Sequence, residues 1–110
     1  MTADPYRFEF DHAVPLVEAE MSLHLSLFAV AGLYGEARVR LDARYHLDEA
    51  GHAILVDGDT EVGAAVVQVF TSLALREFGE TAFQVRRAPS AFTLPQGPER
   101  QEPSGGPVLA

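Results

Sequence analysis

The amino-acid sequence predicts an α+β fold of the ferredoxin-like type, a sandwich in which a four-stranded antiparallel sheet carries two helices on one face. Three observations support this prediction. Two strand patterns meet at a turn in the middle of the chain, a helical pattern lies on either side of them, and a short repeat relates the two halves. Two interleaved strand–helix–strand units give this order, β-α-β-β-α-β.

The first strand is expected at residues 6–10, where aromatic and charged residues alternate with the period of a half-buried strand. Pro15 suits the first turn of the helix that follows. Residues 16–34 alternate apolar and polar side chains as a strand does, but their apolar residues also recur at helical spacing. Their Leu, Ala, Met and Glu content favours a helix, and Gly35 stands where a C-terminal cap belongs.

The next two strands, predicted at residues 37–47 and 52–57, form a hairpin. Asp48 and Gly51 between them suit the first and fourth positions of a type I turn. Pairing across this turn leaves residues 36–41 without a hairpin partner.

A second helix is predicted at residues 60–78, after the candidate cap Thr60, and a fourth strand at residues 82–87. A shift of 44 positions places Tyr34-Gly35-Glu36 on Phe78-Gly79-Glu80. Each triplet follows a helical pattern and precedes a strand pattern. The repeat therefore favours the helical interpretation of residues 16–34.

The chain has room for a single domain, which we assign to residues 1–88. Residues 89–110 contain five of the seven prolines, so we expect a disordered Pro/Gly-rich tail. Cysteine is absent, which excludes disulfides and thiol chemistry. The first residues do not resemble a signal peptide, and no apolar run approaches the roughly 20 residues that span a bilayer. We expect a cytoplasmic protein with no membrane partner.

Charge suggests a candidate partner face. The net charge of −8 opposes binding to nucleic acid, and the central strands offer no outward aromatic side chain on which a base could stack. In the predicted sheet, however, basic side chains gather on the face away from the helices. A surface of this kind suits an acidic protein or a small anionic ligand, and the alternative is a solvated face that blocks aggregation. The candidate face consists of Arg7, Arg38, Arg40, Arg44, His46 and Arg86.

The hairpin also predicts a homodimer. The four apolar residues Ala53–Val56 place two aliphatic side chains on the open face, beside the arginines. The overhang at residues 36–41 offers unpaired amides to a second copy. Both features favour a symmetric dimer that uses this strand, this face or both.

No arrangement of residues predicts catalysis, a metal or a cofactor. Asp57, Asp59 and Glu61 suit a turn and a helix N-terminus better than a cation site. We therefore expect a small non-catalytic, self-associating interaction or ligand-binding module of unknown process. The alternative is a small enzyme whose site at a dimer interface uses His46, His52 and arginines.

Overall fold

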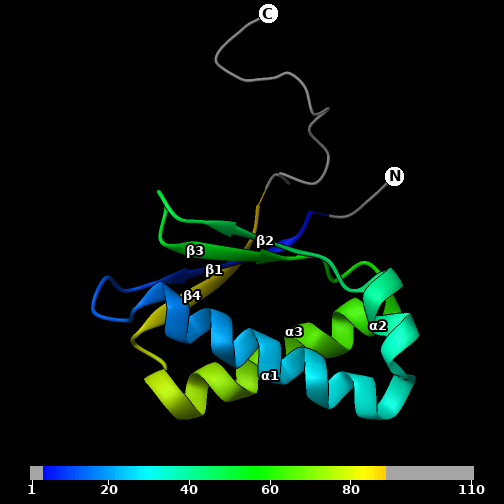
Figure 1. The fold of residues 1–110 in the computed structure, drawn as a ribbon. Helices are drawn as coiled ribbons and strands as arrows, with labels where there is room; N and C mark the ends of the chain where they lie inside the picture. The colour runs from blue at the N-terminus through cyan, green and yellow to red at the C-terminus, as the bar shows by residue number, and fades with distance from the viewer. Residues whose placement is uncertain (1–3, 89–110) are drawn as a thin grey trace, which may run out of the picture.

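The structure, a computed structural model, describes residues 4–88. Within them lie a four-stranded antiparallel sheet and three helices, with the helices on one face of the sheet (Figure 1). This confirms the α+β class and the antiparallel sheet, but adds a helix to the two expected. The tail predicted at residues 89–110 lies outside the described residues. The elements are β1 (Tyr6–Phe10), α1 (Leu16–Tyr34), α2 (Glu36–Asp42), β2 (Tyr45–Asp48), β3 (Ala53–Val56), α3 (Glu61–Phe78) and β4 (Phe83–Arg87).

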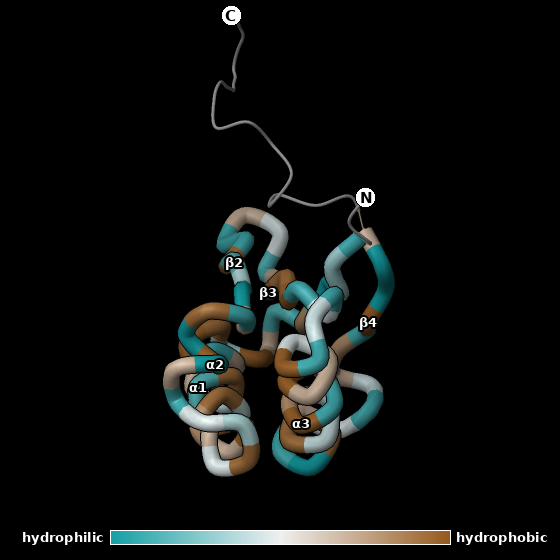
Figure 2. Tube along the Cα trace, turned by 90° about the vertical axis from the view of Figure 1, so that its right-hand side faces the viewer, coloured by the Kyte–Doolittle hydropathy of each residue, from teal (hydrophilic) through white to brown (hydrophobic). Residues whose placement is uncertain are grey.

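The segment with two possible periodicities, residues 16–34, is the helix α1. It follows Pro15, and it ends at Gly35, whose φ of 94° is favourable only for glycine and whose N–H donates to the Ala31 carbonyl. One face of α1 contains the buried residues Leu23, Ser26 and Val30. Figure 2 shows α1 and α3 side by side below the sheet.

The predicted strand at residues 37–47 is wrong over most of its length, because Glu36–Asp42 forms the helix α2. Alternation of arginine with apolar residues suggested a strand, but most of these residues are good helix formers. The helical spacing also brings Glu36 to Arg40 and Arg38 to Asp42, at 3.2 and 3.7 Å between charged atoms. Only Tyr45–Asp48 remains as β2, so no strand overhangs the hairpin at residues 36–41.

The sheet has the order β2-β3-β1-β4. Phe8 in β1 pairs with Ile54 in β3 and Val85 in β4, and this row faces the helices. The adjacent row contains Arg7 and Leu55 and faces away from them.

Aromatic side chains form the centre of the core. The ring centroids of Phe8 and Phe70 lie 4.6 Å apart, and both side chains are fully buried. Phe10 and Phe83 extend this cluster along the sheet. The core therefore joins β1 and β4 to α3, and α1 covers it from the side.

Thr60 sets the start of α3. Its Oγ1 accepts a hydrogen bond from the Gly63 N–H at 2.8 Å and donates one to the Asp42 carbonyl at 3.1 Å. It is thus an N-cap that also ties the end of α2 to the start of α3. Gly63 is needed here, because a Cβ at this position would overlap the Asp57 carbonyl.

Candidate interaction surface

The predicted basic face is divided between two parts of the molecule. Arg7, His46 and Arg86 do share one row on the open face, because Arg7 pairs with both Leu55 and Arg86 and His46 pairs with Leu55. Arg38 and Arg40 lie on α2 instead, where each is within 4 Å of a carboxylate. Arg44 precedes β2, and its carbonyl accepts the Asp57 N–H.

The arginines that do lie on the open face are matched by carboxylates. Glu9 Oε2 accepts from Arg7 Nε at 2.6 Å and from Arg86 Nη2 at 2.7 Å. Arg7 Nη2 also lies 2.9 Å from Asp48 Oδ2. Two cations thus face two anions, and the group connects β1, β2 and β4.

Electrostatics agree with this pairing. Hydrogen bonds from Arg86 and then Arg7 hold the pKa of the Glu9 carboxyl below its ordinary value of 4.5. The hydrogen bond to Glu9, followed by the contacts with Asp48, raises the pKa of Arg7. The two arginines and two carboxylates of this network balance one another, so little net charge remains there to attract an external anion.

The aliphatic side chains of the open face are covered within one subunit. Leu55 is 4% exposed and Ala53 is fully buried, although both point away from the helices. The neighbouring Arg7 side chain is itself only 17% exposed and lies next to Leu55 in the sheet. The expectation that these side chains lack cover is therefore wrong.

The histidines considered for catalysis do not converge. His46 lies on the open face, whereas the His52 Nε2 lies 2.6 Å from the Val14 carbonyl, at the start of the helical layer. The nearest ring partner of His52 is His12, at 4.9 Å between centroids. His24 Nε2 lies 3.0 Å from the Tyr45 hydroxyl and so connects α1 to β2.

The carboxylates after β3 have structural roles. Asp57 Oδ1 accepts the Asp59 N–H at 2.9 Å, closing the turn before α3. Among residues 4–88, no three His, Asp or Glu side chains are grouped closely enough to hold a metal ion.

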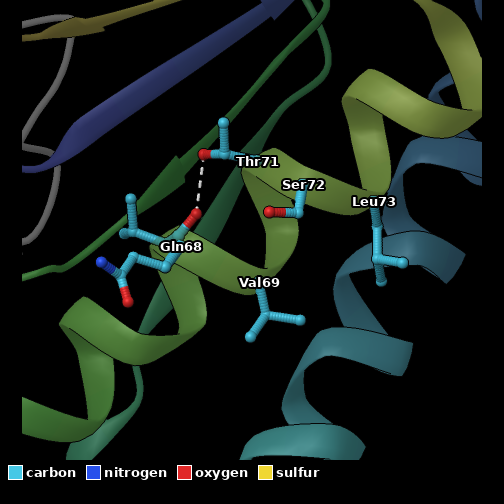
Figure 3. A pocket seen from close by; sticks show the side chains of 6 residues that line it. Gln68, Val69, Thr71, Ser72 and Leu73 are labelled. Carbon is cyan, nitrogen blue, oxygen red and sulfur yellow. Dashed lines mark hydrogen bonds between the residues drawn. The ribbon is translucent and has the colours of Figure 1, made fainter.

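A hollow of about 600 Å³ lies along α3 (Figure 3). Its lining comes from one stretch of the helix, between Val67 and Leu73, and includes no titratable side chain among the described residues. The hydroxyl of Thr71 donates to the Val67 carbonyl, and Leu73 extends toward α1. This hollow lacks the convergent polar groups of a ligand or catalytic site.

A run of exposed apolar side chains at helical spacing lies on α1 and was missed by the sequence interpretation. Val17, Met21, Leu25 and Phe28 follow one another at intervals of three or four residues and thus occupy one helix face. They are 62%, 62%, 59% and 79% exposed. We call this set the α1 outer stripe. It lies opposite the buried face, so α1 is apolar on two sides.

The sequence signal for the stripe is that α1 carries apolar residues on two opposite sides. An ordinary surface helix places polar residues opposite its core face, but here the outward positions 17, 21, 25 and 28 are all apolar. By length and composition alone, α1 could also cross a membrane, since its mean hydropathy reaches 1.4. A buried core helix passes the same test, and α1 contributes Leu23 and Val30 to the core.

Comparison of the chain with protein-family models, with curated proteins and with solved structures finds no match. Its function is therefore inferred from its own residues.

Proposed function

We propose that this protein is a small non-catalytic interaction module that self-associates through the α1 outer stripe. The observation that carries the proposal is the exposure of Val17, Met21, Leu25 and Phe28 on one face of a well-packed helix. At the usual areas of such side chains, the stripe presents about 500 Å² of apolar surface, at the upper end of what a monomer normally exposes.

The magnitude is sufficient for association. Removal of about 500 Å² of apolar surface from water contributes roughly 12 kcal/mol per subunit before any cost is subtracted. Two subunits together contribute about twice this value, against a loss of translational and rotational freedom of about 4–15 kcal/mol. Ordering of the interface side chains is a further cost, so the area favours association and does not set its affinity.

The non-catalytic character is supported by the side chains that a reaction would need. His52 is engaged with the Val14 carbonyl and lies on the other side of the sheet from His46. Arg7 is matched by Glu9 and Asp48. These groups are committed to the fold, which favours a binding module over an enzyme with a shared site.

The finer fold assignment is part of the same proposal. We regard the chain as a variant of the ferredoxin-like sandwich, with α2 added between α1 and β2. The alternation of strands and long helices, with all helices on one face of the sheet, supports this assignment. In this architecture the free side of a helix is available to a partner.

Sedimentation of matched variants tests the proposal. We expect the wild-type chain to form a dimer over a range of about 1–300 μM, and Phe28→Glu to remain a monomer because two buried carboxylates would face the interface. Leu75→Glu is the control, since Leu75 is also apolar and 45% exposed but lies on α3. This control should dimerise as the wild type does. A wild-type chain that stays monomeric at the highest concentration would contradict the proposal.

A further inference from the structure

We infer that the partner on the α1 outer stripe is a second copy of this chain, with the two α1 helices antiparallel about a twofold axis between residues 24 and 25. This inference rests on the proposed self-association and adds its orientation and its contacts. Three properties of α1 support it: the order of side-chain sizes along the stripe, the position of Gly32, and the distribution of charge.

The order of side chains is self-complementary in the antiparallel direction. About an axis between residues 24 and 25, Met21 faces Phe28 of the second copy, and Val17 faces Gly32. Phe28 is the largest and most exposed side chain of the stripe, and Met is an adaptable partner for an aromatic ring. Leu25 lies beside the axis and meets its own copy. Phe28 therefore meets a flexible residue, Val17 meets a small one, and two leucines lie together at the centre.

Gly32 extends the stripe by one helical turn beyond Phe28. A Cβ at Gly32 would meet nothing within 4 Å, so no contact inside the subunit requires glycine. Glycine within a helix is less favourable than alanine. A second helix that approaches closely at this point accounts for the missing side chain, because small residues allow helix backbones to come together.

Charge favours the antiparallel orientation over the parallel one. The acidic residues of α1, Glu18 and Glu20, both lie in its N-terminal third, and α1 contains no arginine or lysine. A parallel pair would bring these carboxylates close to their own copies. In the antiparallel pair they lie at the levels of Ala31 and Ala29 along the second helix, away from their own copies, and the two helix dipoles oppose each other favourably.

The area is adequate for a specific dimer. About 500 Å² of apolar surface from each subunit gives roughly 1,000 Å² in total, the lower limit for a specific interface. The flanking residues Glu20, His24 and Ala29 are partly or fully exposed and would add to this total.

Disulfide cross-linking tests the orientation, because the natural chain contains no cysteine. A disulfide needs Cα atoms within about 7 Å. In the antiparallel dimer, Leu25→Cys should form linked dimers under mild oxidation, since position 25 lies beside the axis. Val17→Cys alone should not, because its copies are separated by about 22 Å along the helix. A mixture of Val17→Cys and Gly32→Cys should form the mixed dimer.

Controls separate this inference from the proposed function. Leu75→Cys, on α3, should not form linked dimers and measures random collision. Efficient linkage of Val17→Cys to itself would establish a parallel pair and overturn the orientation while self-association stands. A sedimenting dimer with no linkage at positions 17, 25 or 32 would place the interface elsewhere and overturn both the stripe and the orientation.

The other possible occupants of the stripe are also outcomes of the test. A chain that is monomeric at about 300 μM and binds phosphatidylcholine vesicles through Phe28 would assign the stripe to a lipid surface and overturn the inference. Monomers that bind no vesicle would overturn it as well. In the expected case, Phe28→Ala weakens the dimer by about 100-fold or more, because both copies lose a central aromatic contact.

Discussion

Phe70→Ala should cause the largest loss of stability among single substitutions in α3. Phe70 is fully buried, its ring lies 4.6 Å from Phe8, and it also contacts Phe10 at 6.2 Å between centroids. Removal of a buried phenyl ring loses its transfer free energy and leaves a cavity, about 3–5 kcal/mol in total. A domain of this size has only about 5–15 kcal/mol of stability, so a fall in Tm of about 15–30 °C is expected.

Phe28→Ala is the matched comparison, since it removes the same atoms from a helix at a position that is 79% exposed. Urea unfolding followed by far-UV circular dichroism, at two protein concentrations, gives the free energy of unfolding of each variant. We expect the deficit of Phe70→Ala to be independent of concentration. The deficit of Phe28→Ala should be within about 0.5 kcal/mol at low concentration and grow as the dimer forms. Equal deficits for the two variants at low concentration would refute the assignment of core and surface.

Three further predictions concern local features. Glu9→Gln should destabilise the chain by up to about 1 kcal/mol at pH 7. Because the folded state lowers the pKa of Glu9, the difference in free energy of unfolding from wild type should shrink as the pH falls below 4.5. A difference that persists in acid would contradict the network. Thr60→Ala should cost about 1–2 kcal/mol in thermal unfolding and Thr60→Ser much less, since serine keeps the hydroxyl that caps Gly63; equal losses would argue against the cap. Gly63→Ala should destabilise the fold by about 1–3 kcal/mol through its clash with the Asp57 carbonyl. Gly32→Ala should raise the stability of the monomer by up to about 1 kcal/mol and weaken the dimer. A stabilising Gly63→Ala together with a destabilising Gly32→Ala would refute the positions assigned to both glycines.

Much of the fold was predictable from local pattern. The alternation at Tyr6–Phe10, the cap at Thr60 and the apolar stripe of α3 each produce a period or a hydrogen bond that a short segment determines on its own. Gly35 ends α1 with a φ of 94°, as its position after the helical pattern indicated, and the structure shows Gly79 ending α3 with a φ of 91°. The α+β class follows from these segments.

The partner surface was not predictable in the same way. The assignment of Arg38 and Arg40 to the sheet required residues 37–42 to be extended, and the alternation there satisfied a strand as well as a short helix. Ion pairs at four-residue spacing and the packing of Val39 against the core decided for the helix. The α1 outer stripe was hidden for a related reason, because a helix that is apolar on both sides resembles an alternating strand.

By itself, then, the sequence determined which segments are helical or extended wherever the apolar periodicity or a capping residue is clear. Periodicity and caps depend on neighbours within a few residues. Only the tertiary structure decided which apolar and charged side chains remain without cover. Leu55 is buried on the sheet face away from the three helices of residues 4–88, while Phe28 is exposed on a helix that the core holds in place. The physical reason is that burial depends on contacts between segments far apart in the chain, and these become defined only when the sheet and helices have assembled.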